Sequence, residues 1–287
     1  MIATACQCSN ARYLNVDLHC HSLYSDGELS PTELVARAID KNIAMLALTD
    51  HDTVDGISEL QKAAADQLQI ITGIEFSSVW KGIGIHIVGL NFDLDDIAEA
   101  TDTQMRARAL RAQIIAEKLE KKGFTGAYAG AQSYAQHNNI GRAHFSRWLV
   151  EQGYCRTQAD AFKKWLGAGK IGDVKVQWPE IPQVIHWIHD AGGVAILAHP
   201  IKYRMTNRKL ATLVNEFAGD GGDGLEIAVA GTDANQLKML ARMANQNGLT
   251  GSRGSDFHSP RQFWSELGKA PSLPADVAPV WLGFDKQ

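Results

Sequence analysis

Short apolar runs alternate with longer amphipathic runs along most of this chain, and this alternation restricts the fold more than any other feature. Near the start, "YLNVDLHCH" is followed by "SPTELVARAIDKN" and then by "IAMLALTDHD". The outer runs predict strands. The middle run predicts a helix, because Ser30, Pro31 and Glu33 form a capping-box sequence with proline in the first turn. Strand, helix and strand in succession favour a parallel sheet covered by helices.

The alternation continues to the end of the chain with one interruption. "IITGIEFSSVW" and "IGIHIVGLNF" predict two further strands. The later amphipathic and apolar runs are "EIPQVIHWIHDAGG", "VAILAHP", "RKLATLVNEFAGDGG", "GLEIAVA", "ANQLKMLARMANQNG" and "LTGSRGSDFH". The sequence therefore predicts an α/β protein whose parallel strands form an open sheet or a closed barrel.

The interruption has a different pattern. "TDTQMRARALRAQIIAEKLEKKG" and "GRAHFSRWLVEQG" predict helices with no strand between them. We therefore divide the chain into an α/β domain (13–95 and 180–287), a helical insertion (96–179) and an N-terminal extension (1–12). The basic face of the first helix is either solvated or turned in part toward an anionic substrate; its members are Arg106, Arg108, Arg111, Lys118, Lys121 and Lys122.

Composition excludes several classes of protein. A net charge of −4 gives no general attraction to duplex DNA, so a polyanion must meet a local basic patch. The four cysteines suggest no disulfide framework, and Cys6 and Cys8 are either a weak metal pair or part of a simple leading tail. No signal peptide or long apolar span is evident. We expect a cytoplasmic protein that does not bind membranes.

Histidines and carboxylates gather where predicted strands end, which is where parallel α/β folds place their active groups. Imidazole with carboxylate suits Zn, Mn or Fe, and clustered carboxylates can bridge two ions. The sequence has neither a G-x-S-x-G turn for a serine hydrolase nor a phosphate loop of Walker spacing. The residues concerned are His19, His21, Asp26, Asp50, His51, Asp52, Glu75, His86, His199, Asp256 and His258.

Other reactive side chains have simpler explanations. His19 and His21 should share one face of a strand, so Cys20 between them should point away and pack. His186 and His189 lie on a predicted helix that precedes its strand, which indicates a structural role. His137 is expected in an exposed loop.

Six motifs resemble, in order and spacing, those of the PHP (polymerase and histidinol phosphatase) family of metal-dependent phosphoesterases. They are "DLHCHSLYSDGELSPTELV", "ALTDHDTVDGI", "GIEFSS", "HIVGL", "AILAHP" and "GSDFH". The resemblance implies a distorted (β/α)7 barrel, the PHP fold, with a helical insertion domain. It also implies two to three metal ions in the barrel mouth, commonly Mn, with Fe, Zn or Mg as alternatives.

The resemblance further implies which residues hold the ions. One ion would be held by His19, His21, Glu75 and Asp256. Glu75 would bridge to a second ion held by His86 and His199. Asp26, His51 and His258 would hold the third. Asp50 and Asp52 would orient the ligand side chains without binding an ion themselves. The catalytic residues would be Glu75, His199 and Asp256.

The insertion, with "GRAHFSRWLV" and "AFKKWLGAGKIG", resembles the RNase AM-like (TrpH- or YciV-like) branch of the family. The resemblance implies that Arg142 and Lys202 contact substrate phosphate, and His144 and Lys170 are further candidates. The usual "AHPGRY" is "AHPIKY" here, so Ile201 and Lys202 replace a glycine and an arginine. Lysine offers a point charge instead of a bidentate fork.

Enzymes of this branch are 5′-to-3′ exoribonucleases and nucleoside 3′,5′-bisphosphate phosphatases. For this chain we expect attack of metal-bound hydroxide on phosphorus, with the 3′ oxygen leaving, in nucleoside 3′,5′-bisphosphates and 5′-phosphorylated single-stranded RNA. One alternative is a small-molecule phosphomonoesterase of the histidinol phosphatase type. Another is a PHP module that has lost catalysis and serves as an interaction part.

Overall fold

The computed structural model describes residues 15–174 and 178–284, so Cys6, Cys8 and the predicted extension 1–12 lie outside the described residues. The strands are β1 (Val16–Cys20), β2 (Met45–Leu48), β3 (Gln69–Ile71), β4 (Gly73–Trp80), β5 (Ile83–Leu90), β6 (Val194–Leu197), β7 (Gly224–Val229) and β8 (Thr250–Gly254). The α-helices are α2 (Pro31–Asp40), α3 (Ile57–Ala64), α4 (Ala98–Glu120), α5 (Ala127–Gln132), α6 (Arg142–Glu151), α7 (Gln158–Ala161), α8 (Ile181–Asp190), α9 (Asn207–Gly219) and α10 (Ala234–Gln246). A π-helical turn, η1 (Phe162–Leu166), follows α7, and 3-10 turns are η2 (Pro200–Lys202), η3 (Phe263–Ser265) and η4 (Val280–Gly283).

The strands form two sheets, ordered β1-β2-β3 and β4-β5-β6-β7-β8. The three-stranded sheet is parallel, as are the pairs β6–β7 and β7–β8. The prediction of an all-parallel sheet was wrong at β5, which runs antiparallel to both β4 and β6. The reason is local: Lys81 and Gly82 both have positive φ and make a tight hairpin turn between β4 and β5, so no crossover helix separates them.

The two sheets meet at their polar ends. Isolated parallel bridges join Cys20 to Phe257 and His51 to Glu75. At the first junction the His21 amide donates to the Phe257 carbonyl at 2.9 Å, and at the second the Asp52 amide donates to the Glu75 carbonyl at 3.0 Å. Both junctions therefore bring candidate site residues together.

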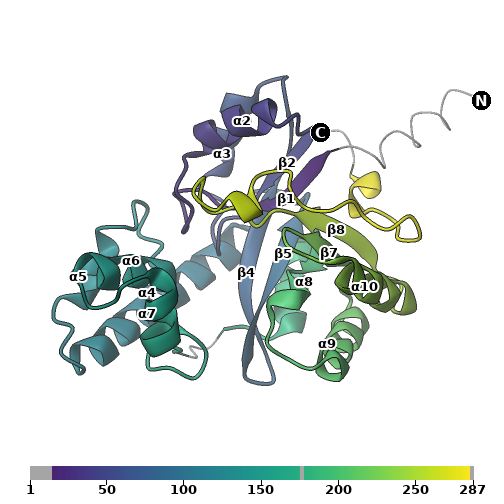
Figure 1. Cartoon of the computed structure of the whole chain (residues 1–287). Helices are drawn as coiled ribbons and strands as arrows, with labels where there is room; N and C mark the ends of the chain where they lie inside the picture. Colours follow the sequence, from purple (N-terminus) through teal and green to yellow (C-terminus); the bar gives the residue numbers. More distant parts are fainter. Residues whose placement is uncertain (1–14, 175–177, 285–287) are drawn as a thin grey trace, which may run out of the picture.

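Helices cover the sheets as their apolar faces predict. The predicted helix at 30–42 is confirmed as α2, with both hydrogen bonds of the Ser30 and Glu33 capping box present. Helices α8, α9 and α10 bury Ile188, Phe217 and Leu240 against the five-stranded sheet (Figure 1). Within the described ranges, no helix combines the length and apolar character needed to cross a membrane.

The segment between β5 and α8 forms the helices α4 to α7, which lie to one side of the sheets in Figure 1. The helices predicted at 101–123 and 141–153 are found as α4 and α6. This segment has its own apolar cluster, whose buried members all fall between residues 112 and 174 and include Phe145 and Leu149. Its separation as a domain of residues 96–179 stays a prediction.

We expect Phe145→Ala to loosen this segment without loosening the sheets. Phe145 is fully buried in the helical cluster, and such a truncation costs about 3–5 kcal/mol. Hydrogen exchange followed by mass spectrometry should show faster exchange confined to residues 98–166. The matched variant Phe217→Ala, on α9, should instead accelerate exchange in β4 to β8. Equal acceleration everywhere in the Phe145 variant would contradict the division.

Candidate metal centre

The structure brings together all nine residues that were predicted as metal ligands. They fall into four overlapping groups, in each of which the candidate ligand atoms lie within 4.8 Å of one another. The members are His19, His21, Asp26, His51, Glu75, His86, His199, Asp256 and His258. Their coordination of an ion stays a prediction.

His19 and His21 reach one cluster, as their spacing on the first strand predicts. Their Nε2 atoms lie 3.4 and 3.3 Å from Oε2 of Glu75, and 3.6 and 3.2 Å from Oδ1 of Asp256. Cys20 points elsewhere, with its Sγ donating to the Ala47 carbonyl at 3.3 Å. The two histidines therefore share the two carboxylates, and the cysteine is packed in the core.

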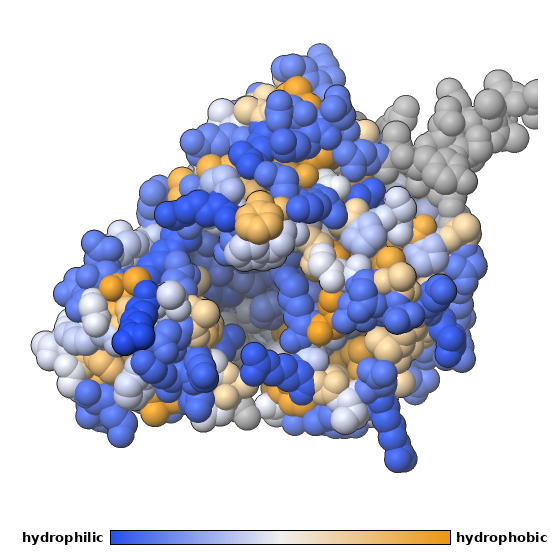
Figure 2. Space-filling view, viewed as in Figure 1, coloured by the Kyte–Doolittle hydropathy of each residue, from blue (hydrophilic) through white to orange (hydrophobic). Residues whose placement is uncertain are grey.

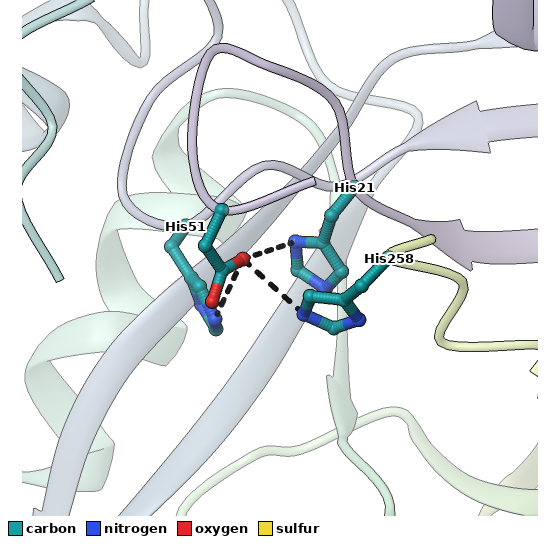
Figure 3. Close-up of side chains that lie close together, drawn as sticks. His21, His51 and His258 are labelled. Carbon is teal, nitrogen blue, oxygen red and sulfur yellow. Dashed lines mark ion pairs between the residues drawn. The ribbon is translucent and has the colours of Figure 1, made fainter. Parts of the chain in front are cut away.

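Asp26 collects three imidazoles from three different segments (Figure 3). Its Oδ1 lies 3.2 Å from Nε2 of His258, 3.8 Å from Nε2 of His51 and 3.9 Å from Nδ1 of His21. One carboxylate oxygen thus faces three imidazole nitrogens, which is an arrangement that ligands of a common ion can adopt.

Glu75 lies at the middle of the cluster because it is near the start of β4, where its backbone bridges to His51. Its Oε1 lies 2.8 Å from both Nδ1 of His86 and Nε2 of His199, and its Oε2 lies 2.9 Å from Nδ1 of His51. One carboxylate therefore presents an oxygen to each of two sets of imidazoles, as a ligand shared by two cations must.

Buried polar atoms without a hydrogen-bond partner test whether this cluster fits a metal. Such orphaned atoms are costly unless something else binds them. Six of those found in the described chain belong to predicted ligands: His19 Nε2, His21 Nε2, Asp26 Oδ1, His51 Nδ1, Glu75 Oε2 and His199 Nδ1. Nitrogen and carboxylate oxygen atoms that converge without partners fit divalent transition-metal ions.

The carboxylates of the cluster are held ionised. Burial opposes ionisation of Glu75, yet His86, His51 and His19 together keep the pKa of its carboxyl well below the usual range. Burial likewise opposes ionisation of Asp256, and Lys202 and His19 outweigh it, so its pKa is also well below the usual range. Ionised carboxylates are the form in which Asp and Glu bind cations.

Glu226 supports the cluster, and the sequence analysis missed it. This buried carboxylate on β7 lies 3.0 Å from Nδ1 of His19 through Oε1 and accepts from the backbone amide of His199 at 2.6 Å through Oε2. It thereby fixes the ring of one predicted ligand and the backbone of another. The available signal was a single acidic residue inside the otherwise apolar run "GLEIAV".

Asp50 and Asp52 do not both serve as predicted. Asp50 accepts from the hydroxyls of Ser22 and Ser25, each at 2.5 Å, and Ser25 lies 3.4 Å from Nδ1 of His21. Asp50 thus reaches a predicted ligand only through a serine. Asp52 accepts from Ser77 and from Nε of Arg108, the latter at 2.5 Å, so it anchors α4 and not a ligand side chain.

A large hollow of about 1340 Å³ opens beside the cluster, between the helices α4 to α7 and the sheets. Figure 2 shows it as a recess on the face of the molecule seen in Figure 1. Asp26, His51, His86 and His199 contribute to its wall on the cluster side. On other sides its lining includes basic residues, namely Arg108, Arg111, Arg142, Lys163, Lys170, Lys202 and Arg204.

Three arginines of the helical segment share one part of this hollow. Arg111 donates to the Val174 carbonyl at 3.2 Å, and Arg142 donates to the Leu166 carbonyl at 3.2 Å. Burial, together with the charges of Arg142 and Arg108, lowers the pKa of Arg111 to about 9. The carboxylate of Asp173 approaches Arg142 only to 3.9 Å, between Oδ1 and Nη1. Asp52 balances the charge of Arg108, whereas the charges of Arg111 and Arg142 are only partly balanced and suit an anion.

The sequence left open whether the basic face of α4 is solvated or turned toward an anionic substrate, and the structure shows some of its residues in each position. Arg108 and Arg111 are buried and line the hollow, whereas Arg106 and Lys118 are exposed. The sequence pattern did not separate the two sets, because the division depends on where the helix packs.

The remaining predicted substrate residues lie at different depths. Lys170 is exposed at the hollow, and Lys202 lines it while its ammonium pairs with Asp256. His144 is buried, and its Nδ1 accepts from the Gly141 amide at 2.9 Å. Burial lowers the pKa of His144 to about 4, so its ring is neutral and serves the start of α6.

The three histidines predicted to lie outside the site do so. His186 and His189, on α8, are exposed and face Asp190 and Asp223. His137 is exposed in a loop and stacks on Tyr24, with ring centroids 3.7 Å apart.

Comparison with known proteins agrees with this site. The family model described as PHP domain matches residues 17–136. A 5′-3′ exoribonuclease from Haemophilus influenzae is 48% identical over 93% of this chain and 98% of that protein. A 3′,5′-nucleoside bisphosphate phosphatase from Chromobacterium violaceum is 37% identical over 93% of this chain and 95% of that protein.

A solved structure has the same fold. It is described as an amidohydrolase from Chromobacterium violaceum with bound sulfate and no metal, and it matches with a TM-score of 0.87 at 36% identity, covering 93% of this chain and 94% of that one. High identity over nearly the whole length extends the relationship beyond the matched domain. The chain therefore belongs to the PHP-domain family of proteins, alongside these exoribonuclease and bisphosphate phosphatase relatives.

Proposed function

We propose that the protein hydrolyses the 3′ O–P bond of 5′-phosphorylated nucleotides, as a 5′-to-3′ exoribonuclease and a nucleoside 3′,5′-bisphosphate phosphatase. The observation that carries this proposal is the hollow, in which a metal-ligand cluster and a separate arginine cluster lie together. A nucleotide with phosphates at both ends of its ribose has one group for each. The printed names of the two curated relatives state the same two activities.

The nine clustered residues would hold two to three ions, of which Mn is our preferred assignment and Fe, Zn or Mg are alternatives. His19, His21, Glu75 and Asp256 would hold the first. His86 and His199 would join Glu75 at the second, and Asp26, His51 and His258 would hold the third. The overlap of the four groups supports ions that share ligands.

Bound ions would supply an activated water and would neutralise charge on the phosphoryl oxygens. Glu75, as the carboxylate facing both imidazole sets, fixes the spacing of the cluster. His199 lines the hollow, so we assign to this residue the transfer of a proton to the departing 3′ oxygen. Asp256 keeps Lys202 at the rim of the same space.

One choice of bond unites the two activities. Cleavage of the 3′ O–P bond of a nucleoside bisphosphate releases inorganic phosphate. Cleavage of the same bond in 5′-phosphorylated RNA releases a 5′-mononucleotide and leaves a new 5′ phosphate on the remaining strand. The product is again a substrate, so the same site can proceed along the strand.

The 5′ phosphate is the anchor in this proposal. Arg142, with Arg111, would bind it through charge-assisted hydrogen bonds, since among the described residues neither has a carboxylate closer than the 3.9 Å between Arg142 and Asp173. Arg108, paired with Asp52, would hold α4 beside them. Lys202 and Lys170 are the further proposed phosphate contacts, and the buried His144 would act by holding α6. A phosphomonoester, as hydrolysed by enzymes of the histidinol phosphatase type, has one phosphate and so no second group for this basic cluster to bind.

The proposal includes the finer fold expected from the family, a distorted (β/α)7 barrel with a helical insertion. The bridges that join the two sheets at Cys20 and at His51 support it. Complete sets of candidate ligands also argue against a module that has lost catalysis.

The direct test compares two versions of one short RNA, with a 5′ phosphate and with a 5′ hydroxyl, incubated with Mn-loaded protein. We expect 5′-mononucleotides from the phosphorylated strand, slower turnover of the hydroxyl strand, and free phosphate from a nucleoside 3′,5′-bisphosphate. Mass spectrometry identifies the products. Release of nucleotides from the 3′ end, or equal rates on both strands, would refute the proposal.

Glu75→Gln should remove metal and activity together while the protein stays folded. A neutral amide cannot bridge two cations as a carboxylate does. We expect at least one ion fewer per chain by elemental analysis and a loss of kcat of several orders of magnitude. The control Glu216→Gln removes an exposed carboxylate paired with Lys81, and should change neither quantity. Full metal content in the Glu75 variant would contradict the bridging role.

Arg142→Ala should separate nucleotide recognition from general phosphatase activity. Loss of a charge-assisted contact of about 1.5–3 kcal/mol lowers kcat/KM for a nucleoside 3′,5′-bisphosphate by about ten- to a hundredfold. p-Nitrophenyl phosphate has no second phosphate, so its kcat/KM should hardly change. Arg106→Ala, on the exposed face of α4, is the control and should affect neither substrate. Equal losses on both substrates would exclude Arg142 as the 5′ anchor.

A further inference from the structure

Phe263 and Trp264, here called the aromatic pair, are the most exposed large apolar side chains among the described residues. Their exposed fractions are 72% and 56%. Their rings meet edge to face with centroids 5.2 Å apart. Two adjacent aromatic rings turned to solvent contribute little to the core, so their exposure calls for a ligand.

The aromatic pair stands on a loop that is fixed at both ends. Before it, the Ser259 hydroxyl donates to Glu28 at 2.7 Å. After it, Glu266 accepts from Nε and Nη2 of Arg37 at 2.7 and 2.5 Å. The Lys269 ammonium donates to the carbonyl of Phe263 itself at 2.7 Å. The rings are therefore presented on a preorganised loop, which lowers the entropic cost of binding.

This loop begins at the candidate metal centre. His258, one of the residues around Asp26, is only five positions before Phe263. Figures 1 and 2 show the segment that follows β8 crossing the edge of the hollow, with apolar atoms at that edge. Neither ring lines the hollow itself. A single nucleotide held between the candidate metal ligands and the arginines would thus lie inside the hollow, and the aromatic pair would lie outside it.

We propose that the aromatic pair is a stacking platform for bases of single-stranded RNA on the 3′ side of the nucleotide being released. This inference rests on the proposed exoribonuclease activity and names the surface that would bind the rest of that substrate. Bases stack on aromatic side chains whatever their identity, which suits an enzyme that must degrade successive nucleotides of any sequence.

Charges around the pair match a phosphate backbone. The Lys269 ammonium lies 5.7 Å from the centre of the Phe263 ring, and the largely exposed Arg261 side chain pairs with Glu28 at 2.7 Å. Arg147, on α6, reaches the same rim, 3.4 Å from Glu28. Basic side chains that track a strand next to aromatic rings are the usual elements of a single-strand site.

The size of the surface argues against a protein partner. Two aromatic side chains bury at most about 500 Å². Stable protein interfaces bury about 1,200 Å² or more in total. Stacked bases need only the rings, so RNA fits the surface better than a second copy of the chain does.

The experiment measures kcat/KM of Mn-loaded full-length protein on two substrates, a short 5′-phosphorylated RNA and a nucleoside 3′,5′-bisphosphate. For the double variant Phe263→Ala, Trp264→Ala we expect the ratio of RNA to bisphosphate activity to fall about five- to a hundredfold, as loss of base stacking predicts. The variant Phe263→Tyr, Trp264→Tyr keeps the rings and should retain the wild-type ratio. Leu282→Ala removes another exposed apolar side chain and serves as the control.

RNA with abasic sites behind its first nucleotide gives a second readout. Removing those bases should slow RNA hydrolysis by the wild type. It should not slow the alanine variant further, because that variant has already lost the stacking contact. An unchanged ratio in the alanine variant would overturn the platform, and so would equal losses on both substrates, which mean damage to the metal centre. Wild-type protein that hydrolyses the bisphosphate but not RNA would refute the exoribonuclease proposal and the platform with it.

Discussion

The carboxylate of Glu75 is the interaction on which the site depends. It lies where the two sheets meet, bridged to His51 through the backbone and in contact with imidazoles from both sheets through its two oxygens. A fully buried carboxylate is expensive unless its neighbours compensate. Here His86, His51 and His19 hold its pKa well below the usual range, and its unpartnered Oε2 leaves a position for a cation. The junction of the sheets and the candidate metal centre thus occupy the same place in the fold.

The antiparallel strand β5 explains how residues from so many segments reach this junction. His86 lies in the first half of β5, which the antiparallel pairing of Ile87 with Leu197 places beside the end of β6. Because β5 is reversed, the His86 carbonyl accepts from the Ala198 amide, next to His199. The Tyr203 hydroxyl accepts from the His86 amide at 2.9 Å and closes this side of the cluster. A departure from the regular βα pattern therefore completes the ligand set.

The sequence predicted the polar cluster better than the surfaces around it. The predicted ligands were found together because each lies in a strand or a few residues beyond one, and chain topology brings these positions to one edge. The division of the basic helix between Arg108 and Arg106, the role of Asp52 and the burial of His144 depend on how α4 and α6 pack against the sheets. Tertiary packing of this kind leaves no pattern in the local sequence. The tight turn before β5 is the one local sign that this strand is reversed.

Burial, and not net charge, would account for the proposed recognition of phosphate in a chain whose formal charge is −4. Lys118, Lys121 and Lys122 are exposed. Water and salt therefore screen their attraction for an anion within about 8 Å at physiological ionic strength. Arg111 is buried and Arg142 is half-buried, which lowers the pKa of each, so screening weakens their attraction for a bound phosphate much less. Attraction concentrated in the hollow favours a terminal phosphate that can enter it. The phosphates of a duplex lie along a rigid outer surface, and a hollow of this kind offers them no comparable contact.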